Sequence, residues 1–418
     1  MKASSTGPVI PEPVDEFAKS VGSLALEFLR NPARREEWRD FYDLFLRVPP
    51  LPIGDGEWVV TRWSDVRATM GHNSAELTAL FPSTSIPEVN KLMLGMLPHE
   101  SGYEHRRMRA LTQPLFKEGR ISKLESDITR QVESLLYPAA FTEAGSDIVG
   151  TLGVRVPEIL SCLLLDVAPE DRDFVGDWSR TLYRQMGRYD QSTDERDAAR
   201  AAYYGIREYV LRCARMPSGP VYGGIGRELF SAWQDGRLDD DQLLSYFALF
   251  LLTGLDTITY AIANSVCFLG SSPQVFSRLR QSPELSGVAF SEAMRLWGPI
   301  RLCVRHLQKH VPTPSCTIPE GALVFILIHA ANRDPECIAD PDQVRWDRSQ
   351  RESIAFGIGP HGCLGGTLGM LVGRILFRSL CTRCARIRVT PDLERASFIP
   401  SLPILGIENV RLYAEPGG

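Results

Sequence analysis

The stretch Phe356-Gly-Ile-Gly-Pro-His-Gly-Cys363-Leu-Gly365, followed by helical periodicity from Gly366 to Leu380, is the most distinctive part of this 418-residue sequence. It places a single cysteine in a glycine-rich loop at the start of a predicted helix. The dipole of that helix and the nearby backbone N–H groups favour the thiolate form of the cysteine. The pattern therefore predicts a sulfur that acts either as a metal ligand or as a nucleophile.

The glycines of the loop indicate what lies beside the sulfur. Gly357, Gly359 and Gly365 allow the backbone to turn tightly and to pass close to a flat ligand that a Cβ would strike. A structural glycine-rich turn is the alternative. The whole pattern, Phe-Gly-x-Gly-x-His-x-Cys-x-Gly, resembles the haem-binding loop of the cytochrome P450 family, with every fixed position filled. The resemblance implies the cytochrome P450 fold, mainly α with a smaller β region, and haem b bound through Cys363 as the axial thiolate, which favours O–O cleavage.

Two further segments resemble the parts of the family that support this loop. Glu292-Ala-Met-Arg295 matches the ExxR signature, and its spacing puts both charges on one helix face. Residues 340–348 resemble the meander that contributes a third charge, Arg348, although Val344-Arg345 replaces the usual Phe-Asp. The resemblance implies a structural charge network of Glu292, Arg295 and Arg348, because buried charges are tolerated only when they are paired.

The segment Leu251-Leu-Thr-Gly254-Leu-Asp256-Thr257 resembles the oxygen-activating helix of the family. The resemblance implies that Gly254 leaves room for dioxygen, and that Asp256 and Thr257 are catalytic residues that deliver protons from water. Thr253 stands where Ala or Gly is common, so it either narrows the pocket or adds a hydroxyl to it. A simple helix kink at this glycine is the alternative.

The haem propionates need basic partners, because two carboxylates cannot be buried unpaired. His105 and Arg109 match the HxxxR segment of the family and share one helix face. Arg305, after Pro299, and His361 in the loop complete the basic set, while a surface or core histidine is the alternative for His105. The cofactor-binding residues implied in this way are His105, Arg109, Gly254, Arg305, Phe356, Gly357, His361, Cys363 and Gly365.

The resemblance locates the substrate contacts without identifying the substrate. They are expected from residues 76–98, 175–190, 247–257, the segment after Pro299, and 399–404. If that segment is extended, alternation puts Arg301 on the same face as Arg305, toward the haem and the pocket. Arg301 would then bind an anionic or carbonyl group of the substrate by a forked hydrogen bond. The alternatives are that Arg301 snorkels to solvent or joins the propionate set.

Composition excludes several other classes of protein. The chain has 46 Lys+Arg and 51 Asp+Glu, a net charge of −5, and therefore lacks the basic excess of a nucleic-acid-binding protein. Its first residues contain no apolar signal-peptide core, which predicts a cytoplasmic protein. The apolar run Leu243–Leu255 is too short to cross ~30 Å of hydrocarbon and predicts a buried core helix. Residues 1–12 are expected to be flexible, and residues 13–418 to form a single domain.

The nine cysteines are odd in number and irregularly spaced, which favours reduced thiols over a disulfide framework. Cys381-Thr-Arg-Cys384 has the spacing of a zinc half-site, but no second pair accompanies it, so two helix-end cysteines are the favoured interpretation. Strands are predicted near 56–62 and 323–328. Helices are predicted at 104–136, 155–165, 195–213 and 241–268.

The expected activity is that of a haem-thiolate monooxygenase acting on a small organic molecule with O2, by hydroxylation or epoxidation, in the tailoring of natural products. Electrons would come from NAD(P)H through a ferredoxin reductase and a ferredoxin, and the enzyme would be a monomer. Five arginines and no acid between His361 and Thr390 form either a docking patch for an acidic ferredoxin or a solvated helix face. The alternative functions are oxidative coupling, desaturation, rearrangement or use of peroxide on the same fold, and a non-catalytic haem- or ligand-binding protein.

Overall fold

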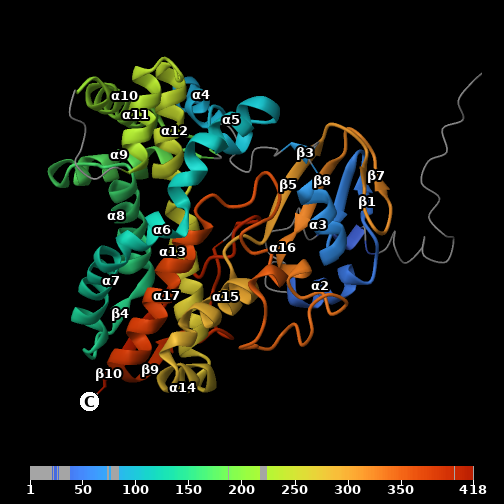
Figure 1. Ribbon diagram of the computed structural model, residues 1–418. Helices are drawn as coiled ribbons and strands as arrows, with labels where there is room; N and C mark the ends of the chain where they lie inside the picture. Colours follow the sequence, from blue (N-terminus) through green and yellow to red (C-terminus); the bar gives the residue numbers. More distant parts are fainter. Residues whose placement is uncertain are drawn as a thin grey trace, which may run out of the picture. The chain divides into compact units, whose positions relative to one another are not determined.

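The computed structural model describes residues 38–72, 75–76, 84–186, 188–216, 224–399 and 401–417, together with positions 21, 23–25 and 27. The chain is mainly helical with a smaller β region, as predicted (Figure 1). It separates into two compact units, each made of several chain segments. The first comprises Met1–Thr78, Val288–Cys363 and Ser397–Glu408, and the second comprises Ala79–Gly287, Leu364–Ala396 and Asn409–Gly418. The tail predicted at 1–12 lies outside the described residues, and the single domain over 13–418 stays a prediction.

A five-stranded sheet with the order β1-β2-β8-β5-β3 forms the centre of the first unit. β2 (Glu57–Val60) and β8 (Leu323–Leu327) pair in parallel, with the buried Val60 opposite the buried Ile326. The other neighbouring strands are antiparallel. The predicted strands near 56–62 and 323–328 are therefore confirmed. The remaining strands of this sheet are β1 (Leu51–Gly54), β5 (Leu302–Leu307) and β3 (Ala75–Glu76).

Side-chain alternation along β5 decides which residues it turns inward. Cys303 and Arg305 are buried, whereas Val304 is half-buried and His306 is exposed, as expected where only one face of a strand is covered. The helices of this unit are α2 (Trp38–Leu46), α3 (Trp63–Gly71), α15 (Ser286–Trp297), α16 (Ile328–Ala331) and the 3₁₀ turn η8 (Gln350–Glu352), and a short hairpin joins β6 (Val311–Pro312) to β7 (Thr317–Ile318).

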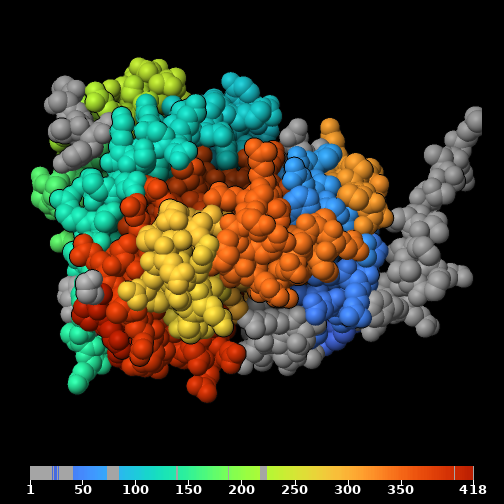
Figure 2. All heavy atoms as spheres, turned by 60° about the horizontal axis from the view of Figure 1, so that its bottom comes forward, coloured from blue at the N-terminus to red at the C-terminus, as the bar shows by residue number. Residues whose placement is uncertain are grey.

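Two consecutive helices, α12 (Asp240–Leu252) and α13 (Leu255–Gly270), form the core of the second unit. Every residue from Leu243 to Leu252 is buried, as expected of a helix that is apolar all round. α13 packs against α8 (Val154–Leu164), α17 (Gly366–Arg383) and the π-helical turn η5 (Ile148–Gly153). α14 (Pro273–Gln281), yellow in Figure 2, lies against α17, whose later part is red.

The helix predicted over 241–268 is interrupted at Thr253 and Gly254. The Thr253 hydroxyl donates to the Leu249 carbonyl at 2.7 Å, and the Thr257 hydroxyl donates to the Thr253 carbonyl at 3.0 Å. Such bonds to the carbonyl four residues earlier compete with the helical ladder and bend helices. The span Asp240–Gly270 is long and apolar enough to cross a membrane, but 61% of its apolar window is buried inside the protein. Its burial agrees with the predicted core helix, although the apolar span is longer than predicted.

The region predicted as one helix over 104–136 is broken into several. Pro114 lacks a backbone N–H and interrupts the helical ladder, so that α5 (Gly102–Thr112) is followed by η3 (Gln113–Phe116), α6 (Glu118–Ile121), η4 (Ser122–Leu124) and α7 (Glu125–Ala140). The helices predicted at 155–165 and 195–213 are confirmed as α8 and α10 (Thr193–Arg215), the latter with a capping box of Ser192 and Glu195. The other elements are α4 (Pro87–Leu94), η2 (Leu97–His99), η6 (Pro169–Asp171), α9 (Arg172–Tyr183), α11 (Ile225–Gln234), η7 (Pro283–Leu285), β4 (Ser146–Asp147), β9 (Cys384–Thr390) and β10 (Arg411–Pro416).

Replacement of Phe377 on α17 tests the packing of this core. Phe377 has no exposed surface, so Phe377→Ala leaves a cavity and should reduce the free energy of unfolding by about 3–5 kcal/mol. Urea titration followed by circular dichroism measures the change. The matched control is Arg378→Ala at the exposed neighbouring position, which should change stability by less than about 0.5 kcal/mol. Equal effects of the two substitutions would contradict the packing described here.

Candidate active site

The cysteine loop is shaped by backbone hydrogen bonds and by two glycines with positive φ. The Cys363 N–H donates to the Phe356 carbonyl at 2.7 Å, which closes the loop. Gly357 and Gly359 have φ values of 67° and 72°, which side chains disfavour. A Cβ on Gly359 would lie 2.4 Å from the Met70 carbonyl oxygen at the end of α3. Contact with α3 therefore requires a glycine at position 359.

The loop presents its cysteine rather than burying it. Cys363 is exposed, and Phe356 and His361 are half-buried. Among the other eight cysteines only Cys337 is exposed. Cys363 also lies three residues before α17 in the chain. An accessible thiol in a loop of fixed shape is suited to bind an external group.

The first unit, which contains the loop up to Cys363, also contains a buried charge network. Glu292, on α15, accepts hydrogen bonds from Arg295 Nε at 2.8 Å and from Arg348 Nε at 3.1 Å. The side chains of all three are at most 3% exposed. The structure therefore brings together the three predicted charges. It also adds the backbone N–H of Arg345, which donates to Glu292 Oε2 at 3.0 Å.

Arg295 connects this charge network to backbone carbonyl groups of the surrounding chain. Its guanidinium donates to the carbonyl oxygens of Asn332 at 3.0 Å and Gln343 at 3.1 Å, and also to that of Pro341. Burial alone would raise the pKa of Glu292, but hydrogen bonding to Arg295, the positive charges of Arg295 and Arg348 and the N–H of Arg345 hold it below its usual value. The Glu292 carboxylate is therefore ionised at neutral pH.

The turn that begins at Ala330 carries two buried side chains that bind backbone groups of other segments. The Asn332 side-chain oxygen accepts the backbone N–H of Ile354 at 2.8 Å, two residues before the cysteine loop. The Asp334 carboxylate accepts the backbone N–H of Trp63 at 2.8 Å. Both side chains are buried. They satisfy backbone groups of distant segments, which is a structural role.

Two arginines are buried, Arg305 within strand β5 and Arg301 just before it. Arg305 is 2% exposed and donates to the Val304 carbonyl at 3.1 Å. It has no acidic partner among the described residues, so an anion beside it would be stabilised. Arg301 is 1% exposed, and the alternative that it snorkels to solvent is wrong.

Tyr42 and His329 lie near Arg301, and Arg333 also acts on both rings. The positive charge of Arg301 acts on Tyr42 and on His329 and lowers the pKa of each. Burial nevertheless raises the pKa of Tyr42 to about 12, and burial brings the pKa of His329 well below its usual value. Both rings are therefore neutral, and His329 Nε2 lies 2.7 Å from the Gly298 carbonyl oxygen. The Arg301 backbone N–H donates to the Pro403 carbonyl at 2.8 Å, which anchors this position in the first unit.

In the second unit, α5 carries His105 and Arg109. His105 is 4% exposed, and burial, followed by the charges of Arg109 and Arg106, lowers its pKa. The imidazole is therefore neutral near neutral pH and can donate one ring N–H. The four-residue step places Arg109 on the same helix face, as predicted from the spacing.

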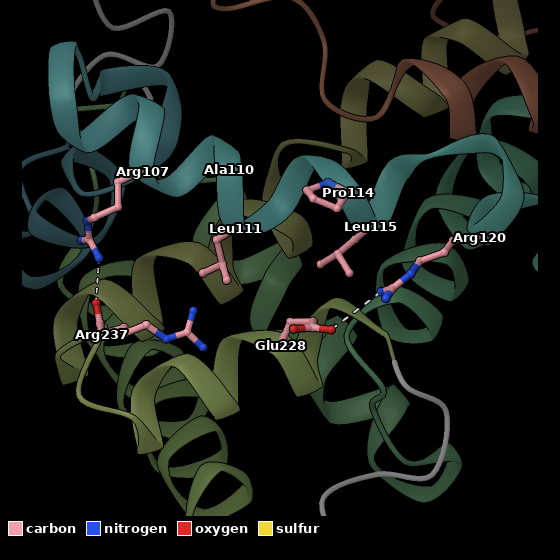
Figure 3. Close-up of a pocket in the computed structure, with 8 residues that line it drawn as sticks. All are labelled: Arg107, Ala110, Leu111, Pro114, Leu115, Arg120, Glu228 and Arg237. Carbon is pink, nitrogen blue, oxygen red and sulfur yellow. Dashed lines mark hydrogen bonds and ion pairs between the residues drawn. The ribbon is translucent and has the colours of Figure 1, made fainter.

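A groove of about 410 Å³ lies along the face of α5 opposite His105 and Arg109 (Figure 3). Contacts across this groove hold α5 in place. Arg107 bridges the groove by donating to the Arg237 carbonyl at 2.7 Å, and it pairs with Glu104 at 2.7 Å. Arg120 faces Glu228 at 3.8 Å across the same groove. The groove is lined by Arg107, Ala110, Leu111, Pro114, Leu115, Arg120, Glu228 and Arg237. None of the predicted site residues lines it. The Arg107 hydrogen bond ties α5, and the Arg120–Glu228 ion pair ties α6, to the region of α11.

Asp256 and Thr257, the acid and the hydroxyl predicted for proton delivery, lie in the first turn of α13. The Asp256 carboxylate accepts a hydrogen bond from the Tyr183 hydroxyl at 2.5 Å, while Thr257 bonds back to the Thr253 carbonyl. A Cβ on Gly254 would meet only Ile258, at 3.4 Å, so the space beside Gly254 is largely open. The Thr253 hydroxyl is occupied by the Leu249 carbonyl and adds no free donor.

Comparison with known proteins places these features in a family. The family model described as Cytochrome P450 matches residues 284–384. The chain is 30% identical over 370 residues to the erythromycin C-12 hydroxylase of Saccharopolyspora erythraea, covering 86% of this chain and 89% of the hydroxylase. This chain belongs to the cytochrome P450 family. It is also 28% identical over 382 residues to the vitamin D(3) 25-hydroxylase of Pseudonocardia autotrophica, covering 88% of this chain and 91% of the relative. The crystal structure of CalO2 superposes with a TM-score of 0.80 at 25% identity, over 94% of this chain and 99% of CalO2.

This P450 is a monooxygenase by family, and its residues fit a haem group. Nothing lies within 4 Å of a Cβ added to Gly365, so the packing of the chain itself does not explain that glycine, whereas a flat group beside the loop does. Cys363 supplies an accessible soft donor, which suits iron. The buried Arg305 suits a propionate.

The basic segment after the cysteine is largely neutralised by acids from other elements. Among its five arginines, Arg388 lies 4.1 Å above the Tyr413 ring. Arg378 is exposed and has no acidic partner among the described residues. The ion pairs are Arg374 with Glu125 at 2.9 Å, Arg383 with Glu133 at 2.6 Å and Arg386 with Glu415 at 3.8 Å. The patch is therefore less basic than its sequence indicates.

Sequence reasoning missed Tyr183 as a site residue. It lies within 175–190, a segment expected to contact substrate, but no pattern distinguishes it from the other tyrosines. Only the packing of α9 near α13 identifies it, because Tyr183 and Asp256 are 73 residues apart in the chain.

Substitution of Glu292 tests the charge network through its pH dependence. Glu292→Gln leaves the buried Arg295 without its carboxylate and Arg348 with only the partly exposed Glu352, and it should destabilise the P450 by about 3–5 kcal/mol at pH 7. Because the folded-state pKa of Glu292 is lowered, its contribution is fully present above the ordinary pKa of 4.5 and is lost as the pH falls through the lower folded value. The difference from wild type in urea unfolding should therefore shrink below that pH.

The control is Glu352→Gln. Glu352 pairs with Arg348 at 3.4 Å but is 39% exposed, so its loss should cost no more than about 1 kcal/mol. A Glu292→Gln effect that is small or constant from neutral to acidic pH would contradict the network.

Proposed function

We propose that this cytochrome P450 binds haem b and inserts one oxygen atom from O2 into a small organic molecule, by hydroxylation or epoxidation, in natural-product tailoring. The observation that carries the proposal is the exposed Cys363 thiol in a loop whose shape is set by backbone hydrogen bonds and glycines. Both relatives described above are hydroxylases by name, which supports hydroxylation. The erythromycin enzyme supports the class of substrate.

The chain contains side chains to hold each part of the cofactor. Cys363 would bind the iron, and the flat ring would be accommodated by the open space at Gly365 and by Phe356 on the same loop. In the first unit, the buried Arg305 and the half-buried His361 would be available to neutralise a propionate. In the second unit, His105 and Arg109 on α5 are the basic groups that the family pattern implies for the same role. Bound haem supplies the redox chemistry that activates dioxygen.

Protons reach the reaction through Asp256 and Thr257. The Thr257 hydroxyl donates its proton to the Thr253 carbonyl, so its lone pairs point away from that bond and can hold a water molecule as acceptor. Asp256 is half-buried, so its carboxylate can exchange protons with solvent and pass them to that water. Gly254 leaves space beside the pair.

Electrons come from NAD(P)H through a ferredoxin reductase and a ferredoxin, and the enzyme works in the cytoplasm as a monomer. The exposed and unpaired Arg378, with the partly exposed arginines after it, supports contact with an acidic carrier. The ion pairs of the other arginines in that segment reduce the positive charge that can attract an acidic electron carrier.

The absorption spectrum of the purified protein, reduced and exposed to carbon monoxide, tests the proposal. A strongly red-shifted Soret band is expected, because thiolate ligation gives the iron its characteristic electronic structure. Cys363→Ala should abolish the band, whereas Cys337→Ala, at the other exposed cysteine, should leave it intact. Absence of haem, or a band that survives loss of Cys363, would overturn the assignment of the iron ligand.

Arg301→Leu tests the proposed substrate contact of Arg301. A forked hydrogen bond to an anionic or carbonyl group is worth about 1.5–3 kcal/mol, so the variant should bind substrate about 10-fold to 100-fold more weakly. The measurement is a spin-state titration with the compound that shifts the wild-type spectrum most, beside haem content, which should not change. The control is Arg378→Leu, which removes a positive charge from an exposed site. Unchanged affinity in Arg301→Leu would refute the contact.

A further inference from the structure

The last residue of α9, Tyr183, makes a short contact with the proton-relay acid. Its hydroxyl donates to Asp256 Oδ2 at 2.5 Å, from one helix of the second unit to another. Tyr183 is half-buried, and burial, followed by the charge of Asp256, raises its pKa far above its usual value. The phenol therefore stays protonated at any working pH and acts only as a donor to the carboxylate.

The two oxygens of Asp256 are in different situations. Oδ2 is held by Tyr183, whereas Oδ1 accepts no hydrogen bond from any residue in the described part of the chain, and the side chain is half-buried. A carboxylate oxygen in that position accepts hydrogen bonds from water. One oxygen is thus fixed in place while the other faces the source of protons.

We propose that Tyr183 is a positioning residue of this P450, which anchors one oxygen of Asp256 so that the other carries protons from water, and which makes this arrangement depend on the placement of α9. The inference rests on the proposed function, because it concerns the acid that relays protons there. It adds a residue from a helix that is expected to contact substrate. Proton delivery is thereby linked to the position of that helix.

α9 is also anchored one turn before Tyr183. Arg180 pairs with Glu158 of α8, and Glu158 is only 8% exposed. Arg155 donates to the same carboxylate at 3.1 Å. The end of α9 is thus held on α8 by an ion pair and on α13 by a single hydrogen bond to Asp256. The ion pair and the packing of α9 on α10 and α12 fix the helix, and the hydrogen bond to Asp256 is the contact that responds to the charge on Asp256.

The charge on Asp256 is set by two opposing effects. Burial raises the pKa of Asp256, and the hydrogen bond from Tyr183 lowers it. Tyr260, one turn along α13, acts on Tyr183 rather than on Asp256. Among the described residues, no charged side chain shifts the pKa of Asp256. On α8 and α9, Arg155, Glu158, Asp177 and Arg180 pair with one another, while Arg172, Asp173 and the exposed Arg184 complete the charged groups of α9 and its end. On α17 and β9, Arg374, Arg383 and Arg386 pair with Glu125, Glu133 and Glu415, and Arg378 is exposed.

Tyr183→Phe in the haem-loaded enzyme tests the inference. Loss of the donor leaves the effect of burial unopposed, so the titration midpoint of the Asp256 carboxyl should rise by about one pH unit, a tenfold change in its ionisation constant. Infrared spectra across a pH series report the protonated carboxyl band directly, and Asp256→Asn identifies that band by removing it. The acid limb of the rate profile should move upward by the same amount, with haem content unchanged.

The matched control is Tyr204→Phe, which removes a hydroxyl from a tyrosine on α10 that is 54% exposed. It should leave both the carboxyl midpoint and the rate profile where they are. If Tyr183→Phe does not fold, 3,5-difluorotyrosine at position 183 replaces it. Its more acidic phenol is a stronger donor and should lower the midpoint instead.

An Asp256 midpoint that is the same in Tyr183→Phe and in wild type, or that does not fall with difluorotyrosine, would overturn the positioning role even where the carbon monoxide spectrum is that of a thiolate-ligated haem. A failed carbon monoxide spectrum overturns the proposed function by a separate measurement, because the infrared titration does not depend on turnover. The two failures are therefore distinguishable.

Discussion

The cysteine loop depends on one buried carboxylate, that of Glu292. Isolated in the interior, this charge would cost several kcal/mol. Instead it accepts hydrogen bonds from Arg295, Arg348 and the backbone of Arg345. Arg295 also donates hydrogen bonds to the carbonyl oxygens of Asn332 and Gln343. The side chain that compensates the Glu292 charge therefore also holds these backbone segments against α15. The Asn332 side chain in turn accepts the backbone N–H of Ile354, two residues before the loop that carries Cys363, so the network is joined to the start of the loop.

The apolar span Asp240–Gly270 is interrupted between α12 and α13, and this interruption serves two purposes. The flanking helices must be buried to form the core of the second unit, yet the residues between them must give room and polar groups to a ligand. Thr253 and Thr257 turn their hydroxyls back onto helix carbonyls, and Gly254 contributes no side chain. These local bonds bend the helix and leave Asp256, in an otherwise apolar span, with Tyr183 as its hydrogen-bond donor.

The sequence predicted most of the residues of this site because they lie in short motifs. Glu292 and Arg295 are one helical turn apart, and the loop from Phe356 to Gly365 is continuous. Arg348 could be found although Val344 and Arg345 depart from the family pattern. The reason is that position 345 contributes its backbone N–H to Glu292, which does not depend on the side chain there. The positions of the helix breaks were harder to predict, because apolar periodicity continues across Thr253 and Gly254.

Charge counted along the chain was a poorer guide than charge in the folded protein. The arginines after Cys363 looked like a uniform basic patch, but Glu125 and Glu133 of α7 and Glu415 of β10 neutralise three of them. Arg301 could not be assigned to solvent or to the interior from alternation alone. Its burial depends on α2 and α16, which bring Tyr42 and His329 beside it.

By itself, the sequence determined the family, the fold class, the cysteine expected to bind iron and the pair Glu292–Arg295, because each rests on residues a few positions apart whose spacing fixes their relation. Arg348, 56 residues after Glu292, could be named only because its own segment resembles a family motif. Tertiary structure alone decided which arginines are buried or paired and that Tyr183 holds Asp256. Those relations join side chains far apart in the chain, such as the 73 residues between Tyr183 and Asp256. The packing of helices brings such groups within hydrogen-bond distance, and no local pattern encodes it.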